Sequence, residues 1–135
     1  MVSKLRLERI AERIRDDLAE ILHQEVSDPR LDGIYITGVK VDRELTFADI
    51  HISALEGAER SKEILDGLKH ASGYLRWSLA QRIELRAFPR LRFHWDSTAE
   101  KAARIEEIIA SLQSEENQTG APIENASDSI EEDDS

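Results

Sequence analysis

Residues 64–96, ILDGLKHASGYLRWSLAQRIELRAFPRLRFHWD, decide the fold of this chain. Their first part predicts a helix, because apolar side chains recur at spacings of three and four and therefore line one helical face. These side chains are Ile64, Leu68, Ala71, Leu75, Leu79 and Ile83. At Phe88-Pro89 the chain becomes extended, since the residue before a proline avoids the helical conformation. The alternation that follows predicts a strand over residues 91–95.

The predicted helix carries a kink signal near its middle, at Ala71-Ser72-Gly73. A glycine inside a helix costs about 1 kcal/mol relative to alanine, and Ser72 competes for backbone hydrogen bonds. Because Gly/Ser pairs are a known cause of kinks, we predict that these residues bend the helix and free backbone N–H groups for a partner. An alternative stays open, in which Gly73 only lets a neighbouring element pack closely.

Positive charge concentrates in the same stretch. Between residues 69 and 95, six basic side chains stand against a single acidic one, Glu84. The six are Lys69, Arg76, Arg82, Arg86, Arg90 and Arg92. Such a local excess indicates a polyanionic partner and leaves few carboxylates nearby for internal pairing. Tyr74 and Trp77 lie between these charges, and their spacing leaves open whether they belong to the core or present ring faces at the surface.

The acidic charge of the whole chain comes largely from its end. The formal net charge is −10 over 135 residues, but residues 113–135 hold eight acidic residues and no basic one. Without them the chain carries 18 basic and 20 acidic side chains. The apolar pattern also stops at residue 113, so we predict one folded domain over residues 1–112 and a disordered acidic tail over residues 113–135.

The remaining segments predict an α+β fold. Helical periodicity covers residues 5 to about 25, with Ser3 as its cap, and β-branched residues predict strands at 34–41 and 48–53 joined in an antiparallel hairpin. A slip in alternation at Gly38 indicates a β-bulge. A final helix is expected from Ser97 to about Leu112. The first helix also carries Lys4, Arg6 and Arg9. Local ion pairing and phosphate contact are alternative roles for these three side chains.

Several function classes find no support in the sequence. There is no cysteine, no nucleotide-binding glycine loop and no pair of histidines at metal-ligand spacing, so no cofactor or metal is expected. A hydrolase that uses His94 and Asp96 lacks a nucleophile nearby. No apolar run approaches a membrane span and the N-terminus lacks the apolar core of a signal peptide, so a cytoplasmic protein is expected.

The order helix, strand, strand, kinked helix, strand resembles the type II KH-like domain of the bacterial ribosome-binding factor A family. The resemblance covers roughly residues 5–112, as a three-stranded sheet with helices on one face. The matching motifs are Asp28-Pro29-Arg30-Leu31, residues 48–53, LKHASGYLRW at 68–77, Leu85-Arg86, Pro89-Arg90-Leu91-Arg92-Phe93 and Asp96-Ser97. As in that family, the kink stands where other KH domains carry a GxxG loop, which this chain lacks.

The resemblance implies a non-catalytic assembly factor. It would be a monomer that binds the free small (30S) ribosomal subunit, contacts 16S rRNA late in maturation, supports processing of the 5′ end, meets other assembly factors and matters for growth in the cold. The rRNA-facing candidates are Lys4, Arg6, Arg9, Lys69, Ser72, Gly73, Arg76, Arg82, Arg86, Arg90 and Arg92. A second hypothesis is a protein-interaction module that contacts a ribosomal protein or another factor through the hairpin.

Overall fold

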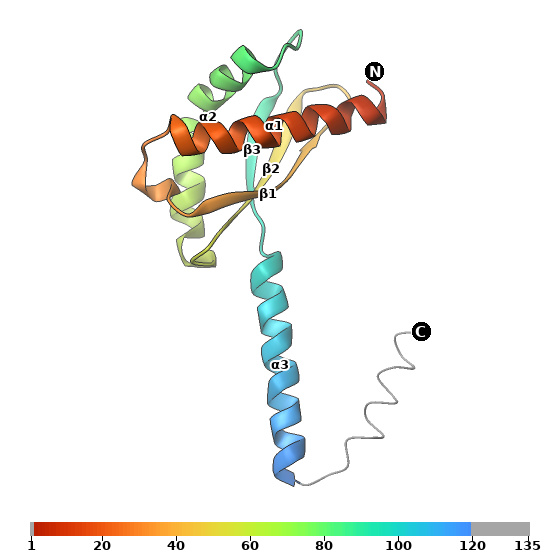
Figure 1. Cartoon of the computed structure of the whole chain (residues 1–135), viewed down its shortest axis with the longest axis vertical. Helices are drawn as coiled ribbons and strands as arrows, with labels where there is room; N and C mark the ends of the chain where they lie inside the picture. The colour runs from red at the N-terminus through yellow and green to blue at the C-terminus, as the bar shows by residue number, and fades with distance from the viewer. Residues whose placement is uncertain (1, 120–135) are drawn as a thin grey trace. The chain divides into compact units, whose positions relative to one another are not determined.

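The structure is a computed structural model that describes residues 2–119. Its elements are α1 (Lys4–Gln24), β1 (Ile34–Val41), β2 (Phe47–Ala54), α2 (Ser61–Arg82), β3 (Arg90–Trp95) and α3 (Thr98–Thr119), with short 3₁₀ turns at Pro29–Leu31 and Ala58–Arg60 (Figure 1). The chain divides into two compact units, Met1–Ser97 and Thr98–Ser135. None of the helices in the described part is both long and apolar enough to cross a lipid bilayer.

The first unit is built on a three-stranded sheet in the order β1-β2-β3. β1 and β2 form the predicted antiparallel hairpin, and their register shifts between Ile36 and Gly38, as expected for a β-bulge. β3 runs parallel to β2, with Phe47 opposite Arg90 and Ile52 opposite Trp95. A parallel neighbour requires a crossover, and α2 supplies it.

One face of the sheet forms the core with α1 and α2. Ala48, Ile50 and Ile52 of β2 are fully buried, whereas Arg90, Arg92 and His94 on the opposite face of β3 are exposed. α1 lies against β1, α2 lies against β3, and the two helices contact each other. The fully buried helix residues are Ile14, Leu18, Ile21, Ile64, Leu68, Leu75 and Leu79. The predicted α+β, KH-like fold class is therefore confirmed.

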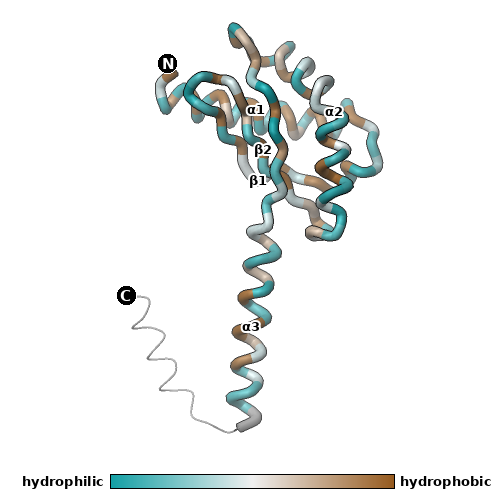
Figure 2. The backbone as a smooth tube through the Cα atoms, turned by 180° about the vertical axis from the view of Figure 1, so that it is seen from behind, coloured by the Kyte–Doolittle hydropathy of each residue, from teal (hydrophilic) through white to brown (hydrophobic). Residues whose placement is uncertain are grey.

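The middle of α2 is bent but not broken. The helix is continuous from Ser61 to Arg82, while Figures 1 and 2 both show its two halves pointing in different directions. The predicted kink is thus confirmed, while the helix continues through it, which removes the reason to expect freed N–H groups. The hydroxyl of Ser72 donates to the carbonyl of Lys69 at 2.8 Å, a bond that bends a helix without ending it.

The two glycines of α2 have different roles. A Cβ added at Gly73 would meet nothing within 4 Å, so the alternative that Gly73 admits a closely packed neighbour is wrong. Close packing occurs at Gly67 instead, where an added Cβ would lie 3.1 Å from Cδ2 of Leu31. Gly73 is therefore an exposed stretch of bare backbone at the bend.

The last helix is longer than its apolar pattern. α3 continues to Thr119, so residues 113–119, assigned to the tail on composition, are helical. Gln113, Glu115 and Glu116 are good helix formers, which allows the helix to extend after its apolar stripe ends. The rest of the predicted disordered tail, residues 120–135, lies outside the described residues.

Candidate nucleic-acid interface

The basic residues singled out in the sequence separate into two groups. Six have exposed side chains for which no hydrogen bond or ion pair is found within residues 2–119. We call these the open cations: Lys4, Arg6, Arg9, Lys69, Arg86 and Arg90. The other three, Arg76, Arg82 and Arg92, have partners inside the protein. This differs from the sequence-based expectation of a cluster without internal pairing.

Arg82 is held by carboxylates of α1 and its cap. Its Nη2 lies 2.6 Å from Oε2 of Glu25, and its Nη1 lies 3.4 Å from Oε1 of Glu20. Glu25 also accepts hydrogen bonds from the hydroxyls of Tyr74 at 2.6 Å and Ser78 at 3.1 Å. The Tyr74 hydroxyl, followed by Ser78 and Arg82, lowers the pKa of Glu25. We refer to Glu25, Tyr74, Ser78 and Arg82 as the Glu25 junction.

Arg76 fastens the segment between α2 and β3. Its guanidinium donates to the backbone carbonyls of Phe88 at 2.6 Å and Pro89 at 3.2 Å. Phe88 is itself buried, so this contact fixes the turn from which β3 starts. Reversal of Arg76 or Arg82 to glutamate would therefore disturb the fold, which makes both residues poor tests of phosphate binding.

Arg92 is paired on the uncovered face of the sheet. It donates to both oxygens of Asp49, at 2.8 and 3.0 Å, and its guanidinium carbon lies 3.9 Å from the ring centroid of Phe47. Nε2 of His94 lies 2.7 Å from the same carboxylate, and His94 stacks on His51. The hydrogen bond from Arg92, together with that from His94, lowers the pKa of Asp49.

A groove between α2 and β3 brings three of the predicted residues together. Lys69 and Ser72 line it from α2, and Arg92 lines it from β3. Its other lining residues are Leu65, Asp66, Leu91, Phe93 and His94. His94 was not among the rRNA-facing candidates, although its alternation with Arg92 along residues 90–95 was a signal that both face the same way.

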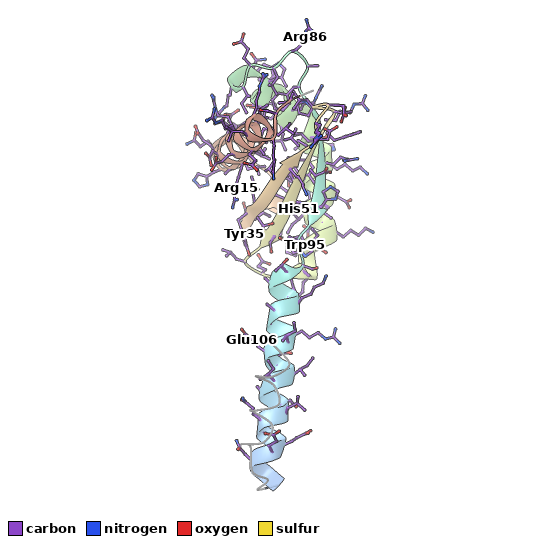
Figure 3. The ribbon with its side chains drawn as sticks, turned by 90° about the vertical axis from the view of Figure 1, so that its right-hand side faces the viewer. Arg15, Tyr35, His51, Arg86, Trp95 and Glu106 are labelled. Carbon is purple, nitrogen blue, oxygen red and sulfur yellow. The ribbon has the colours of Figure 1, made fainter. Side chains whose placement is uncertain are left out.

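The open cations of α1 lie beside the segment that follows α2. Arg6 and Arg9 line a second groove with Arg13 and residues 83–85. Arg86 lies on the same connecting segment (Figure 3) and lines a hollow with Arg43 of the hairpin turn. These cations thus lie beside residues distant in the sequence, in two hollows that also contain Glu84 and Glu44. Periodicity within single elements could not reveal this arrangement.

The exposed aromatic residues are not those of the core. Phe88 is buried and Trp95 is half-buried, whereas Tyr74 and Trp77 are exposed on α2. Tyr74 and Trp77 therefore present their rings at the surface and do not belong to the core.

His94 has its partner on the neighbouring strand. Its Nε2 is hydrogen-bonded to Asp49, and its ring stacks on His51. The hydroxyl of Ser72, in the same groove, is engaged with a backbone carbonyl. Among the described residues, no group of three or more histidine, cysteine or acidic side chains could hold a metal ion.

The chain matches the model of a known protein family. The family model described as ribosome-binding factor A matches residues 6–109. The ribosome-binding factor A of Aromatoleum aromaticum is 38% identical over 104 residues, which cover 77% of this chain and 82% of the relative. The crystal structure of ribosome-binding factor A from Thermus thermophilus aligns with a TM-score of 0.61 at 25% identity, covering 66% of this chain and 93% of that one.

A second solved structure shows a relative in a complex. A homology model of the Thermus thermophilus factor, fitted into a cryo-electron microscopy map of a complex with the 30S subunit, aligns with a TM-score of 0.54 at 27% identity. It covers 64% of this chain and 92% of that one. Since the family model spans most of the sequence and the relatives are matched over most of their own length, this chain belongs to the ribosome-binding factor A family.

Proposed function

We propose that this chain binds the free small (30S) ribosomal subunit, contacts its 16S rRNA and assists the late maturation of that RNA, including processing of the 5′ end. The observation that carries the proposal is the set of six open cations on the first unit. A cation without an internal partner is available to a phosphate, and each phosphate contact releases counterions from the RNA. The fitted 30S complex of the Thermus thermophilus relative supports the choice of polyanion.

The proposed activity is binding rather than catalysis. In this proposal the protein acts in the cytoplasm as a monomer without a cofactor, and its helices and sheet serve as a rigid support for the cations. Recognition would follow the shape of the rRNA, because phosphate contacts fix position without reading sequence. Contacts with other assembly factors, and a role in growth in the cold, belong to the same proposal.

Charge reversal at the open cations tests the proposal. The variant Lys69→Glu/Arg90→Glu should lose most co-sedimentation with purified 30S subunits, and cells that depend on it should accumulate 16S precursor with an unprocessed 5′ end. Lys101→Glu, at an exposed cation of α3, is the matched control for the change in charge. Undiminished co-sedimentation of the double variant, with wild-type binding intact, would count against these cations as the rRNA contact.

A contact with a ribosomal protein or another assembly factor is the second candidate. A hollow beside α1 and β1 favours it, because Leu22, Val26 and Ile34 line it together with the exposed Tyr35, between the charged side chains of Arg15, Asp16 and Asp32. An apolar interface depends little on salt, whereas phosphate contacts weaken steeply. Binding that persists at high salt and is lost on Tyr35→Ala would favour this second candidate.

A further inference from the structure

Two aromatic rings stand exposed just after the bend of α2. Trp77 is 59% exposed and Tyr74 is 44% exposed, although each is large enough to have contributed to a core. Their ring centroids lie 6.0 Å apart with the planes tilted by 35°. The hydroxyl of Tyr74 is bound to Glu25 at 2.6 Å, so the polar end of this ring is fixed while Trp77 presents its indole to solvent.

Trp77 completes a stripe along the exposed side of α2. Lys69, Gly73 and Trp77 are spaced by four residues, so neighbours among them lie on the same side of the helix, with Lys69 before the bend, Gly73 at it and Trp77 after it. All three are exposed. The Lys69 stripe, as we call these residues, therefore offers a cation, then bare backbone, then an aromatic face.

We propose that a single-stranded segment of RNA lies along the Lys69 stripe, with a phosphate on Lys69 and an unpaired base stacked on Trp77. This inference rests on the proposed function and adds a mode of recognition to it. Aromatic side chains beside a cation are the usual platform for single-stranded nucleic acid, because every base has a face that can stack. Gly73 would let the sugar-phosphate backbone approach the helix, since no side chain occupies that space.

The surrounding charge favours an anionic ligand at the stripe. The carboxylate joined to the ring pair is Glu25, and Arg82 offsets its charge at 2.6 Å. Asp66 lies one helical turn before Lys69 and lines the groove together with it. A phosphate approaching Trp77 from the side of Lys69 therefore meets a cation that no carboxylate within residues 2–119 has already paired.

A series of substitutions at Trp77 separates stacking from apolar contact. Affinity for purified 30S subunits is measured for the full chain with Trp77→Phe, Trp77→Leu and Trp77→Ala. Stacking predicts that phenylalanine keeps affinity within a few-fold, while leucine and alanine lose about 5- to 150-fold. Leu55→Ala, which truncates an 85% exposed apolar side chain elsewhere on the unit, is the matched control and should bind as wild type.

Each other outcome overturns the inference in a distinguishable way. If leucine binds as well as phenylalanine and only alanine fails, Trp77 meets an apolar protein surface. If all three variants bind as wild type while Lys69→Glu/Arg90→Glu does not, the proposed function stands and the stacking is wrong. If wild type itself does not bind 30S subunits, the proposed function fails and the stacking with it. Should Trp77→Ala unfold, the comparison of leucine with phenylalanine gives the same answer.

Discussion

Helix α2 contributes basic side chains to two regions. In one region the charge is paired with carboxylates, and in the other it is exposed. In the Glu25 junction the guanidinium of Arg82 lies between two carboxylates, and Tyr74 and Ser78 complete the contacts of Glu25. In the Lys69 stripe the ammonium group is exposed and the neighbouring residue on the stripe is a glycine. The first arrangement joins α1 to α2, whereas the second leaves its charge for a ligand.

The difference teaches that the partners of a charge, and not its position in a basic stretch, decide its role. Arg82 and Lys69 belong to the same helix and the same local charge excess. Yet the carboxylates that hold Arg82 come from residues 20 and 25, and the one that holds Arg92 comes from residue 49. A count confined to residues 69–95 misses all three.

The largest expected effect is that of salt on the open cations. If each of the six neutralises one phosphate, the logarithm of the 30S affinity falls against the logarithm of salt concentration with a slope of about −4 to −5. Between about 50 and 200 mM salt the affinity would fall on the order of 10³-fold. Equilibrium binding across a salt series measures the slope, and Lys69→Ala should make it shallower by about one.

The slope also tests whether the open cations contact phosphates and Arg82 does not. A slope near zero for the wild-type protein would mean that the open cations do not meet phosphates, and that the second candidate, an apolar protein contact, is the better description. If Arg82→Ala makes the slope as shallow as Lys69→Ala does, Arg82 also contacts a phosphate in the complex. The Glu25 junction would then have to open on binding.

The next effect concerns the stability of α2 at its two glycines. Gly73→Ala should raise the free energy of unfolding by about 1 kcal/mol, and the melting temperature by about 4–8 °C, because the new Cβ enters open space in a continuous helix. Gly67→Ala is the matched control and should gain less, since its Cβ would crowd Leu31 and Arg30. Thermal melts followed by circular dichroism measure both.

The affinity of Gly73→Ala for 30S subunits tests whether this glycine serves ligand binding or the fold. A more stable protein that binds 30S subunits less tightly would mean that the glycine serves the ligand rather than the fold. A destabilised Gly73→Ala protein would instead contradict the open surroundings of that backbone.

A smaller effect is expected in acid, at the paired carboxylate of the sheet. The folded protein holds the pKa of Asp49 below its ordinary value, chiefly through the hydrogen bond from Arg92. The pair therefore adds stability above about pH 4 and loses it as the pH falls through the lowered pKa. Asp49→Asn should show a shallower loss of stability below about pH 4 in denaturant titrations. Asp16→Asn, at an exposed carboxylate of α1, should follow wild type.

Much of the fold could be predicted from the sequence because the relevant forces are local. The cap at Ser3, the slip at Gly38 and the periodic residues of α2 act over a few positions, and the structure has all of them. The extension of α3 to Thr119 was missed because the apolar stripe, and not helix propensity, had set the expected end.

The site was harder to predict because its geometry is tertiary. That Arg76 would bind carbonyls beyond the end of its own helix, or that Arg6 would share a groove with residues 83–85, depends on how α1 and the connecting segment pack. The bend at residues 71–73 could be predicted because its cause is local, and Ser72 bonds back to Lys69 there without interrupting the helix. The individual partners of the basic residues near this bend could not be read from spacing.

The smallest expected effect is on 30S binding by Arg82→Ala. Its guanidinium is already bound to Glu20 and Glu25, and a charge that does not touch the RNA is largely screened beyond about 8 Å at physiological salt. Affinity should therefore change by no more than about twofold, while the melting temperature falls because Glu25 loses a donor. Arg82→Lys keeps the charge without the forked geometry and should recover part of the stability. A large loss of affinity in Arg82→Ala protein that remains folded would mean that the bound state releases Arg82 to the RNA, and the distinction between held and open cations would apply only to the free protein.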